Sequence, residues 1–507
     1  MKQWLSKFRS QRLRGRFKDG VGHSQDDDGG WWNQPAFSLL IGFSVWCVAC
    51  VLLHAGMAAR SGTLKLTLAA AGNQFLLLVI TAVCGMLLRV LTPATLAHNA
   101  RLLLLSLCAL ATVIPGSLII HEAGRWTLLP MAAVVMLIPF ALSPLLAGAL
   151  LGGSAAVVAG LWSTLVCLII GNYSIPILLA GLVATAMAAR ITRLLRRRTQ
   201  LIRAGLAIGL VQLVCLIVPM PGDALTASEL VLACVCSGLG AALLTLLLLP
   251  VCESLSGLTS NMTLLELSDL GHPLLQRLAF EAPGTYHHSL TLANLAAAAA
   301  DAIGANSVLA RVGAYFHDIG KVTKPGYFTE NIRTGDNPHD ELTPSMSALL
   351  VMAHIKEGVT LAMLHKLPRP VIDIIQQHHG TGLVIYFHHK AERQSGAEPK
   401  SAAGRGHTTV DESSYRYPGP KPTSRESAII MLADSVEAAS RSLEKPTPTH
   451  IVELVDRLVD AKINDRQLDA CEMTLAELCR VKRSFVFSLS NILHTRIAYP
   501  KPEEKKG

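Results

Sequence analysis

The chain has 507 residues, of which only 16% are charged, and its mean hydropathy is +0.41. This composition is too apolar for an ordinary soluble protein. The formal net charge is +9, but residues 1–252 hold 18 Lys and Arg against 7 Asp and Glu, whereas residues 253–507 hold 27 against 29. A basic protein can bind nucleic acid. Because the excess charge lies in the apolar half, we exclude a nucleic-acid partner.

The first half of the chain is predicted to cross a membrane repeatedly. Residues 1–35 form a basic polar segment, and the apolar run after it starts too late for a cleavable signal peptide. Residues 36–252 then hold about eight apolar stretches, each near the roughly 20 residues that span a bilayer. We place these stretches at residues 36–57, 70–91, 102–120, 128–149, 153–170, 174–191, 205–221 and 229–251.

The basic residues between these spans predict their orientation. With the N-terminus inside, the inner segments carry fifteen Lys or Arg and the outer segments carry three. This asymmetry follows the positive-inside rule. We therefore expect a multi-pass protein of the cell (inner or plasma) membrane, with residues 253–507 in the cytoplasm.

The second half is predicted to be an all-α soluble region, so that the fold class is all-α throughout. Residues 253–284 are expected to form a connector helix, since Leu264, Leu267, Leu270, Leu274 and Leu278 recur at helical spacing. Residues 285–500 are expected to form a compact helical domain. Residues 391–424 are rich in Gly, Ser and Pro and are interpreted as a flexible surface insert.

Histidines concentrate in this second half, where fourteen of the eighteen follow residue 271. Imidazole and carboxylate groups without thiolates suit first-row divalent ions rather than a structural zinc site. A lone His-Asp pair such as His339-Asp340 is weak evidence, and His388-His389 is assigned to a surface helix. An ordered set of seven is specific, because its assembly by chance is improbable. The set comprises one of the pair His287-His288, then His317, Asp318, His354, His378, His379 and Asp434.

This set suits a two-metal phosphohydrolase, in which two ions clamp a phosphate between them. A carboxylate directly after a histidine, as in His317-Asp318, can bridge the ions, because its two oxygens reach separate metals. The adjacent His378 and His379 can face one ion together. Lys321 follows Asp318 by one helical turn and is placed to meet a phosphate oxygen. We therefore assign catalytic roles to Asp318 and Lys321.

The stretches GTYHHSLTLANL, YFHDIGKVTKP, QQHHGT, RYPGPKP and DSVEAASRS resemble the membrane-anchored HD phosphodiesterases of the 7TMR-HD family, of the PgpH type. The resemblance implies an HD phosphohydrolase domain that hydrolyses cyclic di-AMP to pApA in second-messenger turnover. It implies two divalent transition-metal ions, manganese or iron, and a cyclic dinucleotide as the partner. It assigns one ion to His288, His317, Asp318 and Asp434, and the other to His354, His378 and His379, with Asp318 as the bridge.

The chain departs from that family in one respect. Its members typically carry a large extracellular domain after the first span, whereas roughly residues 58–69 alone separate the first two spans here. An extracellular ligand-sensing role is therefore not expected. A homo-oligomer is compatible with the sequence.

Two other functions stay open. The metal ligands do not distinguish adenine from guanine, and the tract PGYFTEN echoes the Gly-Tyr-Pro motif of cyclic di-GMP phosphodiesterases of the HD-GYP type. A catalytically inactive HD interaction module is the second alternative. Retention of all seven candidate ligands argues against it.

The orientation can be tested with reporter fusions. A reporter fused after Gly171 is expected outside and one fused after Glu253 inside, because three predicted spans separate these positions. Activity of a periplasmic or extracellular reporter at Glu253 would contradict the cytoplasmic assignment. A fusion within residues 190–203 serves as the inside control.

Overall fold

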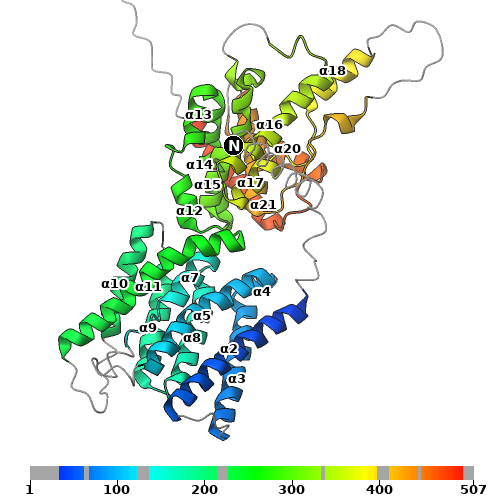
Figure 1. Cartoon of the computed structure of the whole chain (residues 1–507). Helices are drawn as coiled ribbons and strands as arrows, with labels where there is room; N and C mark the ends of the chain where they lie inside the picture. The colour runs from blue at the N-terminus through cyan, green and yellow to red at the C-terminus, as the bar shows by residue number, and fades with distance from the viewer. Residues whose placement is uncertain are drawn as a thin grey trace, which may run out of the picture. The chain divides into compact units, whose positions relative to one another are not determined.

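The computed structural model shows two compact units, Met1–Met262 and Thr263–Gly507. Helices dominate both units (Figure 1), and the isolated β-bridge in the described part of the chain joins Leu383 to Arg416. The predicted all-α class is confirmed. The described residues are 34–61, 68–96, 98–122, 136–192, 195, 197–213, 226–332, 337–396, 410–443 and 447–494.

The first unit consists of apolar helices. They are α2 (Pro35–Ser61), α3 (Leu68–Leu91), α4 (Pro93–Leu96), α5 (Asn99–Glu122), α7 (Leu142–Leu151), α8 (Gly153–Ile170), α9 (Ile175–Thr192), α10 (Arg198–Gln212) and α11 (Ala227–Ser256). By length and composition, the described parts of α2, α3, α5, α8, α9 and α11 are each able to cross a membrane. The basic segment 1–33 lies outside the described residues.

Two predicted spans differ from the helices in the structure. Of the predicted span 128–149, residues 128–135 lie outside the described part, Met136 is helical, residues 137–141 interrupt the helix, and α7 begins at Leu142. The predicted span 205–221 corresponds to α10, which begins earlier, at Arg198. The Gln200 side chain accepts a hydrogen bond from the Arg197 N–H and so caps this earlier start. Residues 214–225 are not described.

The second unit carries the remaining helices. They are α12 (Asn261–Leu267), which straddles the boundary, α13 (Pro273–Glu281), α14 (Pro283–Ile303), α15 (Ser307–Phe316), α16 (Pro344–Leu364), α17 (Arg369–Gln377), α18 (Ile385–Gly396), α19 (Arg425–Ser440), α20 (Pro448–Asn464) and α21 (Leu475–His494), with 3-10 turns η4 (Ile319–Thr323), η5 (Pro325–Tyr327), η6 (Thr329–Asn331) and η7 (Glu412–Tyr415). Helix α16 is also apolar and long enough to span a membrane, but it belongs to the second unit.

The two larger of the three hydrophobic clusters in the described part of this unit hold most of it together. In the first, α14 presents small side chains such as Ala293, Ala296 and Ala300 to α19 and α21. In the second, leucines of α13 pack against Phe316 of α15 and against residues of η4, α16 and α17. Small residues on α14 permit close helix approach, because little side-chain volume separates the two backbones. Both cores include residues of α15 and α17, which carry four of the predicted site residues at their C-terminal ends.

The predicted connector is not a single helix. Helix α11 ends at Ser256, where Gly257 adopts a left-handed conformation, and α12 ends at Leu267. A turn follows, in which the Asp269 carboxylate accepts a hydrogen bond from the Gly271 N–H. Pro273 then opens α13, because proline is compatible with the first turn of a helix but not with its interior.

The predicted insert 391–424 is only partly a surface insert. Helix α18 continues to Gly396, and residues 397–409 lie outside the described part. Residues 410–424 are ordered, and Tyr415 and Tyr417 within them are buried. The Tyr415 ring packs in a cluster with Ala348 and Phe387, and the Tyr417 ring stacks on His379, contacts that composition alone did not predict.

Glycines allow α10 and α11 to approach closely (Figure 1). A Cβ atom on Gly238 of α11 would lie 2.2 Å from the Gly205 carbonyl oxygen and 2.8 Å from the Gly209 backbone nitrogen on α10. In a membrane, helices associate through close packing rather than through the hydrophobic effect, so small residues at a contact are decisive.

We therefore expect Gly238→Ala to destabilise the full-length protein in detergent by roughly 1–3 kcal/mol, because the backbones must separate. Thermal unfolding of the purified protein measures this effect. Gly240→Ala on the same helix is the matched control, since a Cβ there meets nothing within 4 Å. Equal melting temperatures for the two variants would refute the close contact.

Candidate metal centre

Seven predicted side chains come together in the second unit. Asp318, His354, His378 and His379 form one group, and His288, His317 and Asp434 form a neighbouring group. Within each group, one ligand atom per residue lies within 4.8 Å of the others. The residues come from α14 (His288), the end of α15 (His317 and Asp318), α16 (His354), the end of α17 (His378 and His379) and α19 (Asp434).

Two glycines allow these segments to meet. Gly320 lies in η4, directly after Asp318, and a Cβ there would come within 1.9 Å of the His354 carbonyl oxygen. Only a residue without a side chain lets η4 press against α16, so Gly320 sets the distance between Asp318 and His354. Gly380, with φ of 54°, turns the chain after His379 in a conformation that favours glycine.

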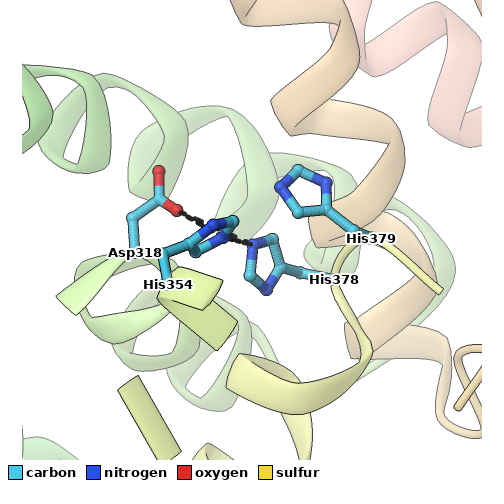
Figure 2. A group of neighbouring side chains, drawn as sticks. All are labelled: Asp318, His354, His378 and His379. Atoms are coloured by element: carbon cyan, nitrogen blue, oxygen red, sulfur yellow. Dashed lines mark hydrogen bonds and ion pairs between the residues drawn. The ribbon is translucent and has the colours of Figure 1, made fainter. Parts of the chain in front are cut away.

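Asp318 lies between the two groups. Its Oδ1 is 3.4 Å from His354 Nε2 and 3.7 Å from His378 Nε2, on the side of the first group. Its Oδ2 is 3.1 Å from His317 Nε2 and 3.9 Å from His288 Nε2, on the side of the second. Each carboxylate oxygen thus faces a different group, which is the arrangement that a bridging ligand requires. Figure 2 shows Asp318, His354, His378 and His379 with their side chains gathered together.

Three histidines are oriented by backbone carbonyl groups. The Nδ1 atoms of His317, His354 and His378 lie 2.8, 2.5 and 2.9 Å from the carbonyl oxygens of Ala314, Val351 and Ile375. Since a carbonyl oxygen only accepts, each Nδ1 carries a proton and donates it, and each Nε2 faces the site, where it can bind a metal. Backbone partners of this kind commonly orient metal-binding histidines.

Several nitrogen and oxygen atoms that face the centre have no hydrogen-bond donor among the described residues. His354 Nε2 and His378 Nε2 lie 3.3 Å apart, although neither carries a proton in this tautomer. His317 Nε2 and Asp318 Oδ1 are buried and have no hydrogen-bond partner among the described residues. Acceptors that face one another without protons are stabilised by a cation between them. The nitrogen and oxygen donors therefore fit divalent metal ions.

Burial controls the charge of the first group. It lowers the pKa of His354 to about 4, an effect that His378 and Lys321 reinforce and Asp318 opposes. Burial also places the pKa of His379 well below its usual range. Burial alone would raise the pKa of Asp318, but the charges of His317 and Lys321 outweigh it and hold that pKa well below its usual range. Near neutral pH, His354 and His379 thus offer neutral imidazoles and Asp318 an ionised carboxylate, which is the state that binds a metal.

His288 is held between two carboxylates. Its Nε2 is 3.1 Å from Asp434 Oδ1 and its Nδ1 is 2.5 Å from Glu437 Oε2. Burial lowers the pKa of His288, but the hydrogen bonds to Asp434 and Glu437 outweigh it and raise the pKa to about 10. A metal ion at this position would displace the Nε2 proton, while Glu437 would keep the Nδ1 proton. Arg441 in turn donates two hydrogen bonds to Glu437 Oε1.

The Lys321 ammonium group lies beside the centre, as predicted. Its Nζ is 2.8 Å from Asp318 Oδ2 and 2.8 Å from Glu330 Oε1. Burial would lower the pKa of Lys321, but these two carboxylates raise it, so the group stays charged. Lys321 and Arg441 both line a cavity of about 150 Å³ that His288, Asp434 and Thr329 also border. Two cations beside the metal ligands suit a phosphate group.

Sequence patterns distinguished the candidate metal ligands from other histidines only in part. His287 is exposed, whereas its neighbour His288 is buried in the site, as predicted. Among the described residues, His339 forms no hydrogen bond with any of the seven candidate metal ligands. Its Nε2 instead donates to the Tyr327 carbonyl oxygen. The pair His388-His389 lies on a helix, α18, and His389 is exposed, as predicted. The prediction was wrong for His388, because its side chain is buried against Tyr415.

Glu437 and Glu330 were not predicted as part of the site. Glu437 follows Asp434 by three residues on α19, so helical spacing alone could have indicated it. Three short 3-10 turns, η4, η5 and η6, cover the segment from Lys321 to Glu330. No periodic sequence pattern predicts that the Glu330 carboxylate contacts the Lys321 ammonium group.

Comparison with known proteins agrees with this architecture. A family described as 7TM receptor with intracellular HD hydrolase matches residues 67–260, and the HD domain family matches residues 285–439. The described helices within the first match include α3, α5, α7, α8, α9, α10 and α11. The chain therefore resembles the 7TM receptors with an intracellular HD hydrolase in both of its halves. Members of this family are multi-pass membrane proteins, and HD domains bind divalent metals, which the two groups of ligands fit.

Curated relatives include two proteins of the same name. Cyclic-di-AMP phosphodiesterase PgpH of Bacillus subtilis (strain 168) is 40% identical over 61% of this chain and 42% of its own length. Its namesake in Listeria monocytogenes serotype 1/2a is 36% identical over 74% of this chain and 51% of its own length. The chain thus spans about half the length of the curated relatives it matches. A crystal structure of the L. monocytogenes PgpH HD domain in complex with cyclic-di-AMP is 44% identical, covers 44% of this chain and 98% of that chain, and has a TM-score of 0.41.

Metal content offers a direct test of the chosen ligands in the HD domain. Asp318→Ala should remove most of the metal from the full-length protein, since both groups lose a ligand and the charge that balances two cations. His288→Ala should remove about half of it. Elemental analysis of the purified variants measures both effects. His287→Ala is the matched control, and a loss of metal in that variant would show that the wrong histidine was chosen.

Proposed function

We propose that this chain is a membrane-bound, metal-dependent phosphodiesterase that hydrolyses cyclic di-AMP to pApA. One observation carries the proposal: the two oxygens of Asp318 face two separate groups of histidine ligands. This arrangement suits two ions that share a phosphodiester between them. The curated relatives named for cyclic di-AMP hydrolysis support the choice of substrate.

We assign manganese or iron to the centre, with one ion held by His288, His317, Asp318 and Asp434 and the other by His354, His378, His379 and Asp318. Nitrogen and oxygen donors without thiolates support these metals. When bound, the ions supply Lewis acidity to the phosphate oxygens and lower the pKa of a nearby water.

Lys321 is assigned to the substrate phosphate. Its ammonium group stays charged between Asp318 and Glu330, and it borders the cavity beside the centre. A phosphate oxygen that approaches Lys321 finds a fixed donor, because Glu330 already holds the ammonium group in place. Preorganised charge of this kind stabilises negative charge without reorganisation.

The catalytic unit is assigned to the cytoplasm. The basic residues between the predicted spans support this side, and a cytoplasmic dinucleotide then has direct access to the centre. Within the described residues, no side chain of the centre distinguishes adenine from guanine. Cyclic di-GMP therefore remains the alternative substrate, although Phe328 stands where the HD-GYP motif carries proline.

A competition assay decides between the two dinucleotides. The purified full-length protein, supplied with manganese or ferrous iron, should consume cyclic di-AMP faster than cyclic di-GMP at equal concentrations and release pApA. Chromatography of the nucleotides measures both losses. Faster loss of cyclic di-GMP would refute the substrate assignment, and loss of neither would indicate an inactive HD module. Asp318→Ala provides the control without metal-dependent activity.

A further inference from the structure

The segment RYPGPKP forms part of the wall of the metal centre. It is anchored on the turn that follows His379: the Tyr417 N–H donates to the Gly382 carbonyl oxygen at 3.0 Å. The Arg416 guanidinium donates to both carboxylate oxygens of Asp465 and to the Thr381 carbonyl oxygen. These bonds fix the backbone of this segment relative to the ligands.

The Tyr417 ring lies directly against two histidines of the first group. It stacks on His379, with ring centroids 4.4 Å apart and planes at 24°, and it meets His354 edge-on at 6.2 Å. The ring is 8% exposed. Its position is therefore determined by the ligands themselves as well as by the anchored backbone.

The hydroxyl group of Tyr417 has no hydrogen-bond partner among the described residues. The contacts of its ring with His379 and His354 place Tyr417 at the edge of the first group of ligands. A tyrosine hydroxyl carries its proton at neutral pH, because its ordinary pKa is near 10, and it can therefore act as a donor.

We propose that the Tyr417 hydroxyl donates a hydrogen bond to a non-bridging oxygen of the phosphodiester in the centre, which makes Tyr417 a catalytic residue. The inference rests on the proposed phosphodiesterase function. A buried phenol that lacks an acceptor gains one when a phosphate enters, and the bond strengthens as negative charge develops on that oxygen. Lys321 approaches the same phosphate as a second donor.

Tyr417→Phe in the full-length protein tests this role, because phenylalanine keeps the ring against His379 and removes only the hydroxyl. Tyr415→Phe is the matched control: Tyr415 is buried in the same segment but packs against His388, away from the centre. Each variant is loaded with manganese and assayed on cyclic di-AMP and on bis(p-nitrophenyl) phosphate. Metal content is measured in parallel.

We expect Tyr417→Phe to retain its manganese and to lose roughly 10- to 100-fold in kcat on both substrates, with a smaller change in KM. Tyr415→Phe should behave as wild type. Wild-type kcat in Tyr417→Phe, loss of manganese, or a defect confined to cyclic di-AMP would each overturn the role at the phosphate. If the wild type hydrolyses only the nitrophenyl ester, the substrate proposal fails while the role of Tyr417 is still decided on that ester.

Discussion

The second unit depends on the burial of one ionised carboxylate. Asp318 is 2% exposed, and a buried charge costs several kcal/mol unless partners compensate for it. Lys321 compensates in part, at 2.8 Å, but four histidine Nε2 atoms also lie within 3.9 Å of the carboxylate oxygens. Three of those rings direct Nε2 toward the carboxylate while their Nδ1 atoms donate to backbone carbonyl groups. Cations held among these nitrogen and oxygen atoms would compensate the buried charge further.

The surrounding helices serve this constraint. Alanines on α14 let α19 approach, which brings Asp434 to His288, and Gly320 lets η4 contact α16. Backbone carbonyl groups at the ends of α15 and α17 then orient the imidazoles. A larger residue at any of these contacts would separate ligands that must act together.

Carboxylates outside the seven candidate ligands also hold the cations beside the centre. Glu330 holds Lys321, and Glu437 holds Arg441 as well as His288. These acids fix the direction of each positive group and neutralise part of its charge. The cavity between Lys321 and Arg441 therefore offers oriented donors to an anion rather than a diffuse positive field.

Much of this protein is determined by sequence alone, since local patterns report local physics. Apolar runs near the length of a bilayer predicted the membrane region, and the order of histidines and acids predicted the seven residues that meet at the centre. Helix ends were less predictable. The start of α10 at Arg198 and the break before Pro273 depend on capping hydrogen bonds that a hydropathy pattern does not contain.

Only the tertiary structure decided which atoms face one another. It assigned the two oxygens of Asp318 to separate groups, buried His388 against Tyr415, and brought Glu330 back to Lys321. It also turned the segment 410–424, which is polar in composition, into an ordered wall whose Tyr417 stacks on His379. Such contacts join residues that are distant in the chain, and their geometry follows from helix packing that no single segment encodes.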